Sequence, residues 1–269
     1  MRIGVAAGLA MLAASSGGAQ ERTTSMKPVL AEDFETDSGA VYRTLARDPR
    51  LVAVAGEGVG GSRALRTTYV GGPTGSGVMA RAIPLGEAGS DYTLNYDVRF
   101  DRDFQFVRGG KMHGFGPARS VTGGDPLRPD GWSARVMWRE KGRPVTYTYH
   151  QDQRDKYGDD GPAVAPFAFA LDRYYAVSLH VRLNDPESAN GLVRLYVDGA
   201  LVSAQEGLRL RSVASKDSLI GNFLFSTFHG GHDPSWAPRN AAGAYVDVHA
   251  YYDNIAVYPG ERIRKRPGG

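Results

Sequence analysis

Apolar and polar residues alternate along much of this chain, which is the pattern of strands that bury one face. Residues 192–205 contain Asp198-Gly199 between two alternating runs, a composition typical of a tight hairpin turn. The clearest strand patterns fall at residues 91–100, 174–183, 192–205, 219–228 and 244–258. These segments predict a β-rich chain in which strands follow one another through short turns.

Helical periodicity is weak, and the turn-forming residues are many. The chain holds 35 glycines and 15 prolines, which favours short strands and turns. Short helical turns are predicted only near residues 212–218 and 234–242. We therefore expect an all-β fold, an antiparallel β-sandwich of jelly-roll type. One concave sheet face would form the substrate-binding groove.

The 269 residues suit one β domain with short additions at both ends. Arg2 precedes an apolar run over residues 3–14 and small residues up to Ala19, the pattern of a secretory signal peptide. We predict a signal peptide over 1–19, a flexible leader over 20–27, the jelly-roll domain over 28–260 and a basic, mobile tail over 261–269. An uncleaved anchor is the alternative for the first segment.

Charge and cysteine content narrow the classes of function. A formal net charge of +3 is too small for the basic stripe of a typical nucleic-acid binder. The chain has no cysteine, which excludes disulfides and thiol catalysis. No segment after the predicted signal peptide is long and apolar enough to span a membrane. We expect a secreted or periplasmic monomer.

Residues 132–139 and 145–151 predict a hairpin with one core face and one chemically rich face. The core face of the first segment carries Trp132, Ala134, Val136 and Trp138. Its opposite face carries Ser133, Arg135, Met137 and Arg139. In the second segment the matching face carries Val145, Tyr147, Tyr149 and Gln151.

The connection between these segments is short and contains glycine, so we expect Arg139 to pair with Val145. That register would place Arg135 opposite Tyr149. Lys111 follows Gly109-Gly110, a pair that suggests a bulge or a close approach of the main chain.

These side chains suit removal of a proton beside a carboxylate. A tyrosine has an ordinary pKa of about 10, and neighbouring cations lower it toward that of a useful base. Lys111 and Arg135 could do so, and could also neutralise a uronate carboxylate, which acidifies the adjacent carbon. The plainer alternative is structural, because alternating tyrosines and Arg–Tyr stacks are common in sheets.

The motifs GGKMHG (residues 109–114), S-x-R (133–135) and Y-x-Y (147–149) closely resemble polysaccharide lyase family 14. That family contains alginate and glucuronan lyases on a jelly-roll fold. The resemblance continues through residues 190–199, 225–238 and 251–257, and so covers most of the domain.

The resemblance implies catalytic roles for Lys111, Arg135, Tyr147 and Tyr149. The two tyrosines would transfer protons, with Lys111 as an alternative base, and Ser133 would position the sugar. We predict further substrate contacts from His113, Arg108, Gln151 and Ser226. Similar proteins often carry an apolar residue and a proline where this chain has Met112-His113, so substrate preference is open at this point. No metal or cofactor is required.

Other interpretations of the functional site were weighed against a lyase site. His229, His232 and Asp233 are too few for a convincing metal site, and the early acidic residues near Asp33 form no evident hydrolase pair. The expected function is an exported lyase that cleaves 4-linked polyuronates, either alginate, in particular its mannuronate-rich parts, or glucuronan. A non-catalytic jelly roll that binds acidic polysaccharides is the alternative.

Overall fold

The computed structural model describes Met1 and residues 27–269. The predicted signal peptide and nearly all of the predicted leader therefore lie outside the described residues. In the described part no helix is both long and apolar enough to cross a membrane.

The larger of the two main sheets has eight strands, each antiparallel to its neighbours. Seven follow the order β14 (Ala200–Leu208), β13 (Gly191–Val197), β12 (Tyr174–Arg182), β7 (Asp91–Phe100), β16 (Val248–Pro259), β3 (Ala64–Tyr69) and β2 (Leu51–Val54). The eighth, β1 (Leu30–Glu32), pairs with β16. One short helix, α1 (Ala40–Leu45), follows β1.

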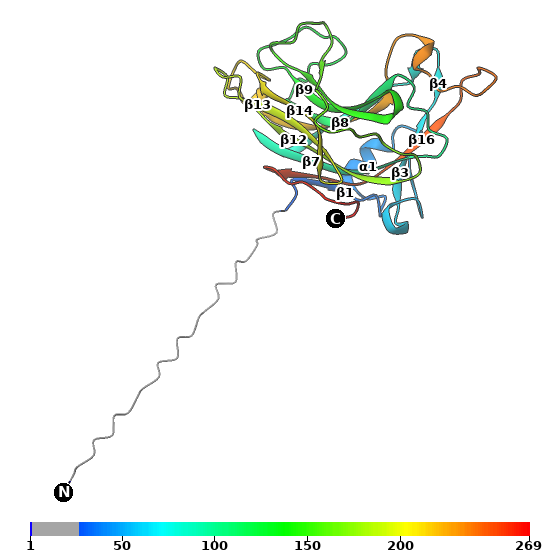
Figure 1. Ribbon diagram of the computed structural model, residues 1–269, viewed down its shortest axis with the longest axis horizontal. Helices are drawn as coiled ribbons and strands as arrows, with labels where there is room; N and C mark the ends of the chain where they lie inside the picture. The colour runs from blue at the N-terminus through cyan, green and yellow to red at the C-terminus, as the bar shows by residue number, and fades with distance from the viewer. Residues whose placement is uncertain (2–26) are drawn as a thin grey trace.

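The smaller sheet has six antiparallel strands and carries the predicted site. Its order is β11 (Asp159–Asp160), β10 (Arg143–Tyr149), β9 (Ser133–Arg139), β8 (Gly109–Gly116), β15 (Ile220–His229) and β6 (Met79–Gly89). β4 (Gly71–Gly72) and β5 (Gly75–Ser76) pair as a separate two-stranded antiparallel ribbon. In Figure 1, β8 and β9 lie above β7 and β12. The prediction of an all-β jelly roll is confirmed.

Side chains from the facing sides of the two sheets form the core. Trp132 and Trp138 are fully buried in it, and their ring nitrogens donate to the carbonyls of Ser218 and Phe106. Burial of this kind supplies most of the driving force for folding. The alternation in residues 132–139 therefore assigned the core face correctly, which leaves Ser133, Arg135 and Met137 on the other face of β9.

The register of the β9–β10 hairpin differs from the prediction by two residues. Arg139 pairs with Arg143, so Arg135 lies opposite Tyr147, and Ser133 opposite Tyr149. The connection is a single 3₁₀ turn, Glu140–Gly142, in which Lys141 has φ 60° and Gly142 has φ 75°. A shift of two residues preserves which face each side chain occupies, so the predicted set stays together.

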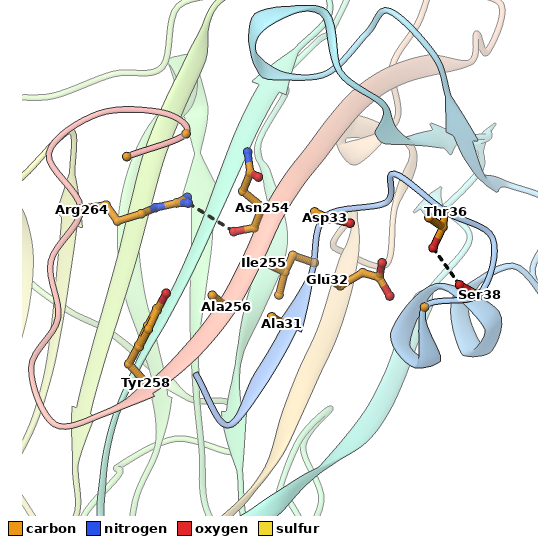
Figure 2. A pocket seen from close by; sticks show the side chains of 13 residues that line it. Ala31, Glu32, Asp33, Thr36, Ser38, Asn254, Ile255, Ala256, Tyr258 and Arg264 are labelled. Atoms are coloured by element: carbon orange, nitrogen blue, oxygen red, sulfur yellow. Dashed lines mark hydrogen bonds between the residues drawn. The ribbon is translucent and has the colours of Figure 1, made fainter. Parts of the chain in front are cut away.

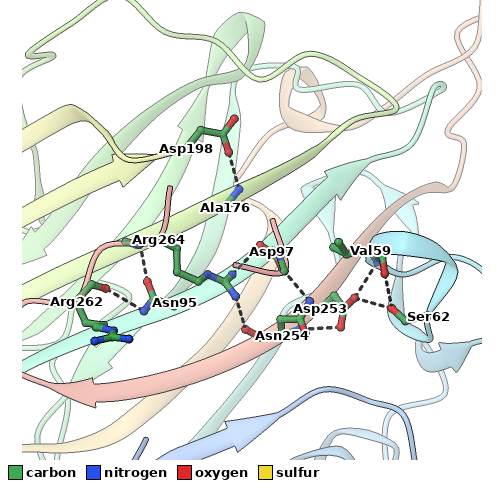
Figure 3. Close-up of polar contacts among 12 residues, drawn as sticks. Val59, Ser62, Asn95, Asp97, Ala176, Asp198, Asp253, Asn254, Arg262 and Arg264 are labelled. Carbon is green, nitrogen blue, oxygen red and sulfur yellow. Dashed lines mark hydrogen bonds and ion pairs between the residues drawn. The ribbon is translucent and has the colours of Figure 1, made fainter. Parts of the chain in front are cut away.

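The C-terminal tail was expected to be mobile and solvated, but in the structure it packs on the outer face of the larger sheet. Arg264 forms a 2.7 Å ion pair with Asp97, whose side chain is fully buried. The Gly268 N–H also donates to Asp97, at 3.0 Å. Figure 3 shows Arg264 reaching Asp97 and the main chain at Asn254. A buried carboxylate needs such partners, which explains why the tail is held.

A pocket of about 430 Å3 separates this tail from β1. Figure 2 shows Arg264 and Tyr258 on one side of the pocket and Glu32, Thr36 and Ser38 on the other. None of the predicted site residues lines it. The pocket therefore lies apart from the chemistry, on the outer side of the sandwich.

Candidate active site

A bulge in β8 decides which residues of GGKMHG face the site. Lys111 pairs with Met137 and Gly114 with Arg135, so one extra residue of β8 is accommodated between these pairs. The bulge turns both Met112 and His113 into the core, where each is fully buried. A strict alternation would have kept His113 on the face of Lys111.

His113 is therefore a core residue, and its prediction as a substrate contact is wrong. Its ring lies 4.4 Å from that of Phe225 and 4.3 Å from that of Tyr252, centroid to centroid. Its Nδ1 is within hydrogen-bond distance of the main chain of Ser226, on β15. Burial lowers the pKa of His113 to about 3, so the ring is neutral and serves to join β8 to β15.

Lys111 projects over two aromatic rings on the site face. Its Nζ lies 5.4 Å from the ring centre of Tyr147 and 5.6 Å from that of Phe228. Within residues 27–269 no carboxylate lies within ion-pair distance of it. Burial, assisted by the positive charges of Arg135 and Arg139, lowers the pKa of Lys111 to about 8. A lysine in this environment can act as a base near neutral pH.

Arg135 is a buried cation without an anionic partner in the described part of the chain. Its exposed fraction is 5%. One terminal nitrogen donates to the Thr122 hydroxyl at 2.9 Å, while Nε meets no acceptor. Burial lowers the pKa of Arg135 to about 10. Burying an unpaired charge is costly, so this guanidinium can bind the anionic group of a ligand.

Tyr147 lies between the cations, yet its phenol is held in the protonated form. Its exposed fraction is 6%. Burial and the adjacent Tyr149 raise the pKa of Tyr147, and this outweighs the opposing effect of Arg139. A neighbouring cation does lower the pKa of Tyr147, but burial raises it more, so the expectation of a lowered pKa is wrong for Tyr147. A protonated phenol is suited to donate a proton rather than to remove one.

Ser133 and Tyr149 are fully buried beneath the loop that joins β8 to β9, residues 117–132. The Ser133 hydroxyl donates to the Val121 carbonyl at 2.7 Å. The Tyr149 hydroxyl accepts from the Gly124 N–H at 3.2 Å. In this arrangement both side chains hold the loop, and the proton-transfer role of Tyr149 stays a prediction.

The remaining predicted contacts divide between the site and the scaffold. Ser226 lines a pocket of about 240 Å3 together with Arg135, Thr122 and Arg81. Arg108 lies at the opposite end of the site and donates to the Ser235 hydroxyl. The Gln151 amide donates to three main-chain carbonyls. Gln151 thus joins main-chain segments, and its contact with substrate stays a prediction.

Three features of the site were missed from the sequence. Thr122 and Gly124 sit in a loop without periodicity, so nothing placed them over Arg135 and Tyr149. Asp160, on β11, pairs with Arg139. Arg139 was already predicted on the site face, and its positive charge was the signal that could have indicated an acidic partner.

The histidines near residue 230 do not form a metal site in the described residues. His229 is buried against Phe104, and its Nε2 lies 2.7 Å from the Gln105 carbonyl oxygen. Burial lowers the pKa of His229 to about 4. As with His113, this ring is a neutral part of the core.

Comparison with known structures finds the same architecture in several lyases. Alginate lyase Aly36B, as a double variant in complex with alginate tetrasaccharide, is 25% identical with a TM-score of 0.69, covering 88% of this chain and 100% of that one. The marine PL-14 alginate lyase from Aplysia kurodai is 22% identical with a TM-score of 0.65, covering 87% and 99%. The endo-β-1,4-glucuronan lyase from the fungus Trichoderma reesei is 17% identical with a TM-score of 0.55, covering 78% and 86%.

A search of curated proteins gives no match. The family model described as polysaccharide lyase 14 matches residues 66–255, which is well over half of the chain and includes β8, β9 and β10. With the fold and the cationic site in agreement, the chain belongs to polysaccharide lyase family 14 and is a polysaccharide lyase.

Proposed function

We propose that the protein is an exported lyase that cleaves 4-linked polyuronates by β-elimination, with alginate as first substrate and glucuronan as second. The observation that carries this is the buried guanidinium of Arg135, which has no carboxylate partner in the described residues and lies beside Lys111 and Tyr147. A uronate carboxylate is the anion that would form an ion pair with this guanidinium. The alginate bound to Aly36B is consistent with that substrate class.

Each protein group has one task in the proposed reaction. Arg135 binds and neutralises the carboxylate, which acidifies the proton on the adjacent ring carbon. Lys111, as a neutral amine, takes that proton. The electron pair forms a double bond in the ring as the glycosidic carbon–oxygen bond breaks. Tyr147 gives its proton to the departing oxygen, and the new non-reducing end carries an unsaturated uronate.

The fixed charge of Arg135 also explains how the reaction would proceed without a metal. Arg135 supplies a fixed positive charge to the carboxylate in a site of low exposure, where electrostatic interactions are strong. Activity should therefore persist in the presence of a chelator. Loss of activity that a divalent ion restores would overturn this part of the proposal.

The test is ultraviolet absorbance of the unsaturated product from alginate, polymannuronate, polyguluronate and glucuronan. Arg135→Gln should keep the fold but lower kcat/KM by about 30- to 5,000-fold, because loss of one partner of a buried charge pair costs about 2–5 kcal/mol. Arg182→Gln is the matched control, since Arg182 is exposed on β12 of the other sheet. Binding without product from any polyuronate would favour the non-catalytic alternative.

Export rests on the signal-like sequence of residues 1–19. The mature protein should be recovered outside the cytoplasm with a mass that lacks these residues. Retention of the full-length chain in the cytoplasm would refute export and leave the proposed reaction untouched.

A further inference from the structure

A second pocket on the site side, here called the rim pocket, lies at the hairpin end of β9 and β10. It measures about 380 Å3 and is lined by Arg108, Arg139, Glu140, Arg143 and Trp236. Arg139 and Arg143 are directly paired across the two strands. The pocket thus gathers three guanidinium groups, one carboxylate and one indole.

The charges of the rim pocket are unevenly balanced. Arg139 is paired with Asp160. Within residues 27–269 neither Arg108 nor Arg143 has a carboxylate within ion-pair distance, and Glu140 contributes the only acidic side chain of the lining. Two guanidinium groups are therefore free to receive an anion, and guanidinium geometry suits a carboxylate.

Trp236 is held in place by its own loop. The Arg108 guanidinium carbon lies 5.4 Å from the indole ring centre, and Arg108 also donates to the Ser235 hydroxyl at 3.2 Å. Asp233 accepts from the Ser235 N–H at 2.8 Å and so caps the turn that carries Trp236. A side chain at Gly231 would meet the indole at 2.1 Å, so the main chain supports the ring directly. Such a rigid aromatic surface can pack on the apolar face of a sugar ring.

The rim pocket is continuous with the centre of the site. The Arg139 guanidinium carbon lies 5.7 Å from the Tyr147 ring centre, so one side chain borders both. Arg135 and Arg139 are four residues apart on the same face of β9, a separation of about 13 Å at ~3.3 Å per residue. A polymer whose carboxylate rests on Arg135 and which runs along β9 would reach the pocket.

We propose that the rim pocket binds a uronate residue remote from the bond that is cleaved. Arg143 and Arg108 pair with the carboxylate of that residue, and Trp236 stacks on its ring. Glu140 opposes this binding. The pocket selects long acidic chains, and this inference rests on the proposed polyuronate lyase function.

The experiment compares KM and kcat on a long polyuronate and on the shortest oligosaccharide that the wild-type enzyme cleaves. Arg143→Gln and Trp236→Ala should each raise KM for the long chain by about tenfold, the effect of losing about 1.4 kcal/mol of binding. Their kcat should stay within about twofold of wild type, as expected for groups that bind ground and transition states alike. Arg182→Gln, with the same charge change on the other sheet, should leave both constants unchanged.

Glu140→Gln gives a result of opposite sign. Removal of the opposing carboxylate should lower KM for the long chain, and added salt should reduce the difference because it screens exposed charges. Equal effects of Arg143→Gln on long and short substrates, an unchanged KM, or a raised KM in Glu140→Gln would each overturn the rim pocket as a polyuronate subsite.

Failure of the proposed function would be seen separately, as wild-type protein that yields no unsaturated product. In that case, equilibrium binding of the polyuronate decides the question for the rim pocket. Weaker binding by Arg143→Gln but not by Arg182→Gln would support it, with a neutral polysaccharide as the control ligand. Equal affinity of both variants would refute it.

Discussion

The pH dependence of catalysis distinguishes Lys111 from a tyrosine as the base. Burial and the charges of Arg135 and Arg139 lower the pKa of Lys111 to about 8, whereas burial raises the pKa of Tyr147. The base must be neutral to act, so kcat/KM should rise with pH and level off above the pKa of Lys111. Tyr147 stays protonated across this range, so no alkaline decline is expected from it.

The size of the effect follows from these values. With a pKa of about 8, roughly one Lys111 in ten is neutral at pH 7, compared with roughly one in 3,000 for an ordinary lysine near 10.5. The environment therefore supplies a gain of about 300-fold in active base at neutral pH. Between pH 6 and pH 7, kcat/KM should increase by about tenfold.

Arg139→Gln tests one electrostatic cause of the shift, which adds to the larger effect of burial. Loss of this positive charge stabilises the protonated form of Lys111, and it also leaves the negative charge of Asp160 without its arginine partner. Both effects raise the pKa of Lys111, so the rising limb of kcat/KM should move to higher pH. The profile is measured from the initial rate of absorbance increase in buffers of constant ionic strength. A limb that stays in place, moves to lower pH, or lies near pH 10 in the wild type would refute Lys111 as the base.

Two further predictions concern the scaffold. Gly114→Ala would bring a methyl group within 2.0 Å of the Ala134 carbonyl oxygen, so it should destabilise the fold by about 1–3 kcal/mol and lower activity by displacing Arg135. Gly86→Ala, which places its methyl group in open space, is the control in thermal unfolding. Equal melting temperatures of the two variants would contradict the reasoning. Burial raises the pKa of Asp253 to about 6, so its ionised form costs stability at pH 7 and this cost is relieved as pH falls through 6 toward 4. Relative to Asp253→Asn, the wild type should gain up to about 3 kcal/mol of unfolding free energy between pH 7 and pH 4, and a difference independent of pH in denaturant titrations would contradict this.

Several parts of the site were predictable because strand alternation is a local property. Trp132, directly before β9, and Trp138, within it, had to share one face, and Arg135 had to lie on the other. The hairpin register was less accessible, because it depends on the left-handed conformations of Lys141 and Gly142. The predicted register was wrong by two residues, and an even shift leaves each side chain on the same face of its strand.

The assignments that failed depend on contacts between distant segments. His113 was misplaced because a bulge between β8 and β9 breaks the period of two. Tyr149 and Ser133 were expected to line the substrate cleft, but the β8–β9 loop covers both. The tail was expected to be free because its charges are visible in the sequence, whereas the buried Asp97 that binds Arg264 is not.

The sequence by itself determined the β-sandwich, the faces of its strands and the residue types available for chemistry, since these follow from periodicity and composition. Only the tertiary structure decided which groups are charged and which are reachable. Protonation depends on how far each group is removed from water and on charges brought close by other strands. That is why Lys111 is proposed as the base and Tyr147 as the acid, and why Arg135 is proposed to bind the carboxylate of a substrate.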